Sequence, residues 1–211
     1  MLKATLETLY MSFVSLAISF ILALILGSII AETRPNGLFK NQLINSILNR
    51  IVDVGRSIPF VLLAVFLFPF TRSLIGTAIG TNAMIVPLVV CAVPFEARMI
   101  EEILSQIPKD AIEAAQIDGA NKIQIILFIE LKSKTSLLVN CASISLINII
   151  GHTAMAGIVG GGGLGNYAIV YGFQRYNWWI IFWAVLLIVV IVVIIQIANN
   201  IIVRKLERKS L

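Results

Sequence analysis

Residues that could do chemistry are few in this 211-residue sequence, and they do not gather into a recognisable site. His152 is the only histidine, and Cys91 and Cys141 fall in apolar stretches at no metal-binding or redox spacing. We therefore interpret both cysteines as buried small hydrophobic residues and expect no metal site. An enzyme is disfavoured, because no cluster of histidine, cysteine and carboxylate side chains could act together.

A glycine-rich segment, GGGGLG at residues 160–165, formally satisfies the dinucleotide-binding pattern G-x-G-x-x-G. No strand precedes it and no βαβ unit surrounds it, so we interpret the glycines as close-packing and turn positions, with gating as the second interpretation. The sequence also lacks a G-x-x-x-x-G-K-[ST] segment that could cradle ATP phosphates. We expect no cofactor, and any nucleotide energy has to come from a partner.

The segment AIEAAQIDGANK, residues 111–122, predicts a water-tolerant helix between two apolar regions. Pro108 can open a helix, and Gly119 can end one in the left-handed conformation. Asn121 and Lys122 then start a second helix. About forty residues separate the flanking apolar runs, which is far longer than an ordinary connection and favours a functional loop over a solvated connector.

Composition identifies the bilayer as the solvent of this chain, because 59% of its residues are hydrophobic and only 13% are charged. A formal charge of +5 could suggest nucleic acid as a partner. Basic loops on the cytoplasmic side of a membrane explain the charge better, so we expect no nucleic-acid partner.

Hydropathy predicts an all-α integral membrane fold with about five transmembrane helices, in one domain over residues 5–204. Residues 38–50 look like a surface helix that leads into the second span. Prolines within the spans are tolerated where neighbouring groups satisfy the freed carbonyls. The predicted spans cover residues 10–31, 56–76, 83–104, 135–158 and 178–203, with a loop at 105–134.

The basic residues predict the orientation, because the cytoplasmic side of a membrane protein carries the excess of lysine and arginine. One side holds only Lys3, Arg72 and Arg175 of the sixteen. We therefore expect the N-terminus outside and both the C-terminus and loop 105–134 in the cytoplasm. The other thirteen basic residues lie on that cytoplasmic side: Arg34, Lys40, Arg50, Arg56, Arg98, Lys109, Lys122, Lys132, Lys134, Arg204, Lys205, Arg208 and Lys209.

The fourth span is unusually polar for a membrane helix. Polar groups at membrane depth face a pathway or form hydrogen bonds between helices, and packing is the commoner role for a single serine or asparagine. A structural role is also the commoner one for His152. The pathway candidates in this span are Asn140, Ser143, Asn148 and His152.

The pattern Glu113-Ala114-Ala115, three residues, then Gly119-Ala120 resembles the EAA loop of ATP-binding-cassette importer permeases. Residues 56–80, 85–104 and 154–176 closely resemble the compact methionine-importer permeases. The resemblance covers most of residues 10–205. It implies a type I importer fold in the inner membrane of a bacterium and a role as the permease subunit of a methionine importer.

The resemblance also implies roles for residues. The loop would form a coupling helix that docks on a separate ATPase subunit, and Met155 would belong to a gate. The family normally has a proline after Leu131, where this chain has Lys132. Asp118 differs from the apolar residue usual in methionine permeases. The implied ATPase-docking residues are Glu113, Ala114, Ala115, Asp118, Gly119 and Ala120.

Partners follow from the size of the chain and from the resemblance. About five helices are too few to enclose a solute pathway, so we expect a homodimer with two ATPase copies. A methionine-binding protein outside the membrane is implied as well. The alternatives are the same architecture with another cargo, such as a quaternary-amine osmolyte or another amino acid, and an ATP-independent transporter. The last would show inverted repeats and charge within the spans.

Overall fold

The computed structural model describes residues 1–210, which are mainly helical and contain no strand. The first half holds α1 (Leu2–Thr33), α2 (Gln42–Ser57), α3 (Phe60–Phe66), α4 (Phe68–Ile75) and α5 (Thr81–Leu104). The second half contains α6 (Lys109–Ile117), α7 (Lys122–Gln124), a π-helical segment (Ile125–Leu131), α8 (Thr135–Ala156), a 3-10 turn (Gly157–Val159), α9 (Gly163–Tyr167), a π-helical segment (Ala168–Gly172), a 3-10 turn (Phe173–Arg175) and α10 (Trp178–Ser210).

Four helices in the described part of the chain are long and apolar enough to cross a membrane. They are α1, α5, α8 with the turn that follows it, and α10. Each contains one of the predicted spans, and α1 and α10 extend well beyond the predicted bounds. Pro87 and Pro94 lie inside α5 without ending it, as expected for prolines in a packed membrane helix.

The expected span at residues 56–76 is not one helix. Pro59 holds an extended backbone with φ −60° and ψ 131°, so α2 ends just before it and α3 begins just after it. Pro69 then stands in the first turn of α4, and Gly76 ends that helix at φ +87°. Prolines therefore divide the segment 56–76 into short helices, whereas the two prolines of α5 leave that helix continuous.

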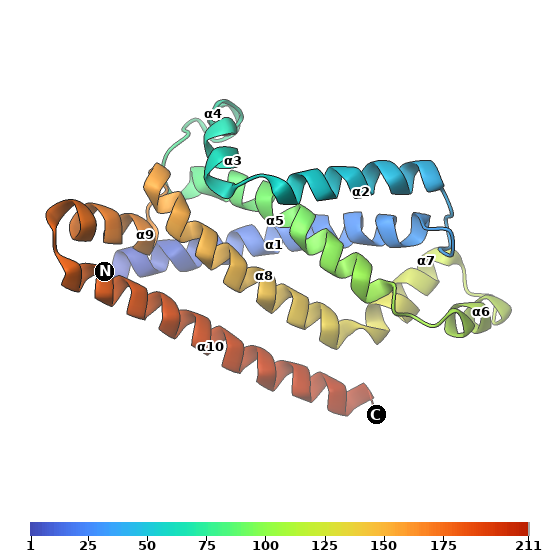
Figure 1. Ribbon diagram of the computed structural model, residues 1–211. Coiled ribbons are helices and arrows are strands. Elements are labelled where there is room, and N and C mark those ends of the chain that lie inside the picture. Colours follow the sequence, from blue (N-terminus) through green and yellow to red (C-terminus); the bar gives the residue numbers. More distant parts are fainter. Residues whose placement is uncertain (211) are drawn as a thin grey trace.

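The predicted surface helix at residues 38–50 forms as α2, which begins at Gln42 and continues to Ser57 with mostly exposed side chains. Asn41 caps α2 by accepting a hydrogen bond from the Ile44 amide over 3.1 Å. The helix then runs alongside α1 and α5, with Val52 buried (Figure 1). Arg98 of α5 joins the two helices, because it donates to Asn49 over 2.8 Å and to Asp53 over 2.7 Å.

The core lies where α1 crosses α5, at a point of close backbone approach. A Cβ on Gly27 would stand 2.8 Å from the Ala97 carbonyl oxygen and 2.9 Å from Ile100. Membrane helices pack closely through small residues. Moving an apolar side chain from lipid into a helix interface gains little free energy, so association depends on close van der Waals contact. Ala23, Ile30 and the helix α8 complete this packing.

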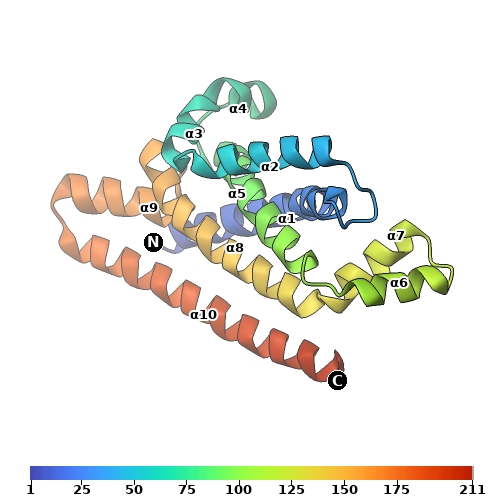
Figure 2. The same ribbon diagram turned by 45° about the vertical axis from the view of Figure 1, so that its right-hand side comes forward.

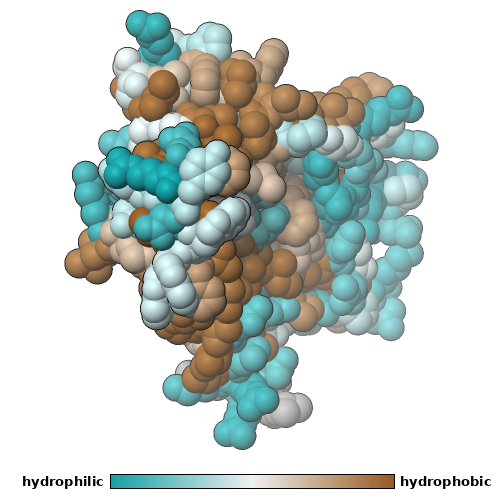
Figure 3. Space-filling model, turned by 60° about the vertical axis from the view of Figure 1, so that its left-hand side comes forward, coloured by the Kyte–Doolittle hydropathy of each residue, from teal (hydrophilic) through white to brown (hydrophobic). Residues whose placement is uncertain are grey.

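The bundle has two distinct ends. The N-terminus and α9 lie at one end, and α6, α7 and the last turns of α10 lie at the other (Figures 1 and 2). We call these the glycine end and the loop end. Hydrophobic side chains cover a large share of the face in Figure 3, as expected of a surface that meets lipid or another subunit.

Candidate functional site: the projecting loop and the glycine end

The corner after α6 forms as the sequence predicts. Gly119 has φ +85°, a conformation that side chains rarely adopt. Its amide donates to the Gln116 carbonyl over 3.0 Å, and the Ala120 amide donates to the Ala115 carbonyl over 3.0 Å. This pair of bonds is a Schellman ending, which satisfies carbonyls that a helix terminus leaves free. No atom stands within 4 Å of a Cβ placed on Gly119, so the backbone angle alone requires glycine there.

The chain restarts as a helix at Asn121, again as predicted. Asn121 and Gln124 form a reciprocal capping box, with both side chain to amide distances at 2.9 Å. The following segment, Ile125–Leu131, is π-helical and so has wider turns than an α-helix. Such segments are rare and occur often at functional sites.

The predicted docking residues divide between two faces of this corner. Glu113, Ala114, Asp118 and Gly119 are exposed, whereas Ala120 is half-buried. Ala115 is only 9% exposed. It therefore packs α6 against the rest of the chain and does not lie on the outer face.

Ile117 is the residue of this corner that sequence reasoning missed. Its side chain is 85% exposed at the end of α6. The sequence signal for it was a large apolar residue one turn after Glu113, in a helix made mainly of small and polar residues. Together with Glu113 and Ala114 it gives α6 an outer surface with one acidic, one small and one large apolar side chain, which another protein can approach.

Lys122 fastens the loop to the turn between α1 and α2. Its ammonium donates to the Leu38 carbonyl over 2.7 Å and lies 4.7 Å from the centre of the Phe39 ring. That turn contains Pro35, Asn36 and Gly37 and is closed by a 3.0 Å hydrogen bond from the Gly37 amide to the Arg34 carbonyl. A displacement of α6 would therefore reach α1 as well as α5.

The chain enters α8 without the proline that the resemblance led us to expect. Lys132 keeps helical backbone angles, and Lys134 turns the chain at φ −103° and ψ 14°. The Lys134 amide donates to the Glu130 carbonyl over 3.3 Å. The corner after Leu131 is thus made by ordinary residues.

The polar residues of α8 do not form one group. Asn140 accepts a 2.8 Å hydrogen bond from Asn199, which joins α8 to α10. Ser143 and Asn148 are half-buried. The structure therefore gives Asn140 a packing contact, whereas Asn148 and His152 stand one helical turn apart on the same side.

Met155 and His152 lie on an open side of α8 near the glycine end. Met155 is 47% exposed, and a Cβ on the exposed Gly151 would meet no atom within 4 Å. His152 stacks at a tilt on Phe60 of α3, with ring centres 5.0 Å apart. In a single chain Gly151 and Met155 are therefore exposed, whereas His152 is half-buried against the Phe60 ring.

The glycine segment packs backbone against backbone, which confirms its interpretation as a turn and close-packing element. A Cβ on Gly165 would overlap the Ala154 carbonyl, and one on Gly157 would overlap the Asn166 amide. Gly160 and Gly162 have φ of +86° and +80°. The chain can fold back directly behind Met155 only because these side chains are absent.

Two residues of α1 hold this segment in place, and the sequence did not single them out. Glu7 Oε2 accepts a hydrogen bond from the Gly163 amide over 2.9 Å, and Thr8 Oγ1 accepts one from the Leu164 amide over 2.9 Å. These contacts satisfy amides at the start of α9 that have no partner within the helix. Their separation of 156 residues along the chain left no local signal.

The family described as "Binding-protein-dependent transport system inner membrane component" matches residues 6–210 of this chain. A Vibrio cholerae protein named "Probable D-methionine transport system permease protein MetI" is 42% identical over 209 residues, which are 99% of this chain and 93% of that protein. The Escherichia coli K12 protein named "D-methionine transport system permease protein MetI" is 44% identical over 151 residues, 72% of this chain and 70% of that protein.

A solved structure described as "Inward facing conformations of the MetNI methionine ABC transporter: CY5 native crystal form" superposes with a TM-score of 0.95. The two chains are 41% identical, and the match covers 97% of this chain and 95% of that one. Both the sequence and the arrangement of helices therefore agree with those relatives, and the chain belongs to the family of inner-membrane components of binding-protein-dependent transport systems.

Proposed function

We propose that this chain is the permease subunit of an ATP-binding-cassette importer and forms the path for methionine across the inner membrane. Hydrolysis of ATP takes place in a separate subunit, and this chain contributes no covalent chemistry. The methionine cargo is supported by the names of relatives at 42% and 44% identity. Two chains with two ATPase subunits make the working complex, and a binding protein delivers the solute.

The observation that carries this proposal is the exposed position of α6 at the loop end of the bundle. The helix projects from the loop end of the bundle, ends sharply at Gly119 and exposes Glu113, Ala114 and Ile117 (Figure 2). A polar helix that exposes a large apolar residue away from the membrane core fits a groove on a soluble partner. We infer that the loop end faces the cytoplasm and the N-terminus faces outside, as the basic residues predict.

The open stripe of α8 supports a path shared between two copies. In a single chain Gly151 and Met155 are exposed, and Asn148 on the same side is half-buried. In a two-fold dimer the same stripe from each copy would face the axis. ATP-driven closure of the two ATPases would move the α6 corners together and favour the outward-facing packing over the inward-facing one.

Transport by the reconstituted complex tests this proposal. The chain, its ATPase and its binding protein are placed in proteoliposomes, and uptake of labelled methionine, betaine and choline is compared. We expect ATP-dependent uptake of methionine alone. Uptake of betaine or choline but not of methionine would show that the cargo is a quaternary amine. Uptake without ATP would refute the proposal that this chain belongs to an ATP-driven importer.

Matched glycine variants test the docking corner. Gly119→Ala requires a left-handed alanine, which costs about 1 kcal/mol at the turn, and Gly119→Pro cannot adopt the angle at all. Both should weaken ATPase binding in pull-down measurements, the proline more than the alanine. Gly151→Ala is the control, because it also enters open space but has an ordinary helical backbone. Equal ATPase binding by all three variants would contradict the docking role.

A further inference from the structure

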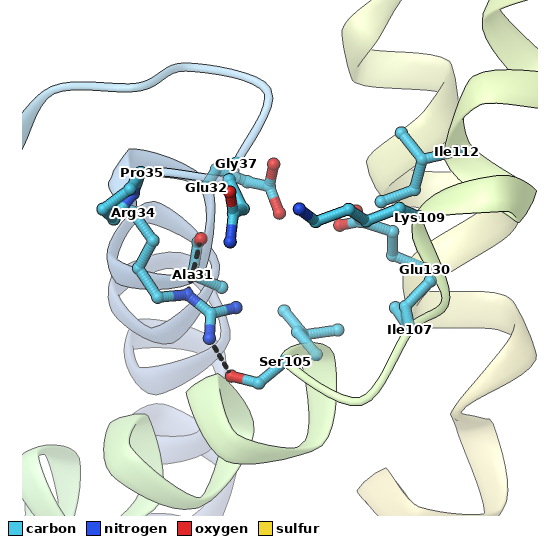
Figure 4. Close-up of a pocket in the computed structure, with 12 residues that line it drawn as sticks. Ala31, Glu32, Arg34, Pro35, Gly37, Ser105, Ile107, Lys109, Ile112 and Glu130 are labelled. Carbon is cyan, nitrogen blue, oxygen red and sulfur yellow. Dashed lines mark hydrogen bonds between the residues drawn. The ribbon is translucent and has the colours of Figure 1, made fainter.

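The loop meets α1 at a second place, a cavity of about 200 Å³ at the loop end of the bundle (Figure 4). The turn after α1 forms one side, and the start of α6 with the segment that follows α7 forms the other. Two acidic side chains, Glu32 of α1 and Glu130 of the π-helical segment, line this cavity. Neither belongs to the docking pattern or to the gate.

Both glutamates are withdrawn from solvent. Glu130 is 2% exposed and Glu32 is 6% exposed. Glu32 Oε2 accepts a hydrogen bond from the Leu38 amide over 2.9 Å, which ties it to the turn before α2. Glu130 Oε2 has no hydrogen-bond partner among the described residues. A buried carboxylate oxygen without a donor is costly, and each such group requires an explanation.

The cations near the pair do not neutralise it. Arg34 donates to the Ala31 carbonyl and to the Ser105 hydroxyl (Figure 4). Lys109 reaches toward the cavity from the start of α6. Among the described residues, no ion pair joins Arg34 or Lys109 to either glutamate. The remaining way to relieve two neighbouring buried carboxylates is a proton.

The local electrostatics point the same way. Burial and the neighbouring Glu32 carboxylate raise the pKa of Glu130 from its ordinary value of 4.5 to about 8, against the opposing effect of the Arg34 guanidinium. Two ionised carboxylates can only accept hydrogen bonds, whereas a protonated one donates. A proton on Glu130 would turn the repulsion between the two carboxylates into a hydrogen bond to Glu32.

We propose that Glu32 and Glu130 share one proton and that this pair fastens the ATPase-docking loop to the end of α1. Glu130 is thereby a positioning residue for coupling, and the inference rests on the function proposed above. The pair lies beside the bond from Lys122 to Leu38, so the loop holds the turn after α1 at two points. Motion of α6 then reaches α1 through both.

The sign of the pH dependence follows from proton linkage. The attached pair binds a proton with a pKa of about 8, whereas a detached and solvated Glu130 would titrate near 4.5. Attachment is therefore strongest in acid and weakens by up to about tenfold per pH unit across this interval. It is weakest above the upper value, where both groups are ionised. Alkaline pH on the loop side should uncouple the transporter.

Infrared titration of the purified full-length protein tests the proton directly, with no need for ATPase or methionine. We expect the difference between the wild-type chain and Glu130→Gln to contain a protonated-carboxyl band that disappears with a midpoint near 8. Glu32→Gln should shift the midpoint downward, because it removes the like charge. Glu102→Gln, an exposed acid on α5, should leave the band unchanged. The absence of a Glu130-dependent band at neutral pH would overturn the proposal.

The coupling role has its own measurement, which is methionine imported per ATP hydrolysed at two loop-side pH values. From about pH 7 to about pH 8.5 the ratio should fall severalfold for the wild-type chain and for Glu102→Gln. It should stay constant for Glu130→Gln, which keeps the shape and cannot ionise. A flat wild-type profile, or loss of coupling in Glu130→Gln at both pH values, would overturn the positioning role. Failure of methionine uptake at every pH would instead count against the proposed function and leave the infrared result valid.

Discussion

The hydroxyl of Ser19 on α1 donates a hydrogen bond to Glu96 Oε1 on α5 over 3.0 Å, in the interior of the bundle. Glu96 is fully buried, and its other carboxyl oxygen has no partner within residues 1–210. An acidic residue therefore stands inside a helix that we expect to cross the membrane. Such groups are expensive there and persist only when neighbouring helices supply polar contacts.

Removing the Ser19 hydroxyl should destabilise the protein. Ser19→Ala leaves Glu96 Oε1 without its donor, at a cost of about 1–3 kcal/mol. For a chain of this size that corresponds to a fall of roughly 2–4 °C in Tm per kcal/mol, measured by tryptophan fluorescence in detergent. Ser57→Ala is the control, since that exposed hydroxyl bonds only its own helix. Equal Tm values for the two variants would show that the Ser19 bond is not stabilising.

The glycine segment predicts a second stability difference. Gly165→Ala places a methyl group against the Ala154 carbonyl, which must then move. We expect a loss of several °C in Tm and a lower yield of folded protein. Gly151→Ala should raise the Tm slightly, because alanine in a helix is about 1 kcal/mol better than glycine. Similar Tm values for these two variants would contradict the close packing.

The contact of α1 with the start of α9 leads to a third prediction about stability. Thr8→Val keeps the shape of the side chain but removes the oxygen that accepts from the Leu164 amide. A buried amide without a partner costs about 1–3 kcal/mol, so the thermal transition should shift downward. Thr5→Val is the matched control, because the exposed Thr5 hydroxyl bonds only the Met1 carbonyl. A larger loss in the control than in Thr8→Val would exclude this role.

We expect substitution of Met155 to change the permeability of the transporter without changing its stability. Its side chain is 47% exposed, so Met155→Ala should alter unfolding by no more than about 0.5 kcal/mol. As a gate residue it should alter methionine uptake or the leak of solute from proteoliposomes without ATP. Ile158→Ala, also largely exposed, provides the comparison. Unchanged uptake and leak in Met155→Ala would remove Met155 from the gate.

Local patterns in the sequence determined much of this protein, because their causes are local. A long apolar run predicts a membrane helix wherever it packs, so α1, α5, α8 and α10 were all foreseen. Gly119 and Asn121 likewise act through their own backbone and side chain, so the corner and the restart of the loop were predictable. The resemblance carried by Glu113-Ala114-Ala115 and Gly119-Ala120 identified the family.

Only the tertiary structure decided which helices and side chains meet. Nothing in the local sequence distinguishes Pro59, which divides the expected second span, from Pro94, which α5 accommodates. Packing of the surrounding helices makes that difference. The pairs Ser19 with Glu96 and Glu32 with Glu130 bring together residues 77 and 98 positions apart along the chain. Their burial and their pairing arise from tertiary contacts, which no local periodicity specifies.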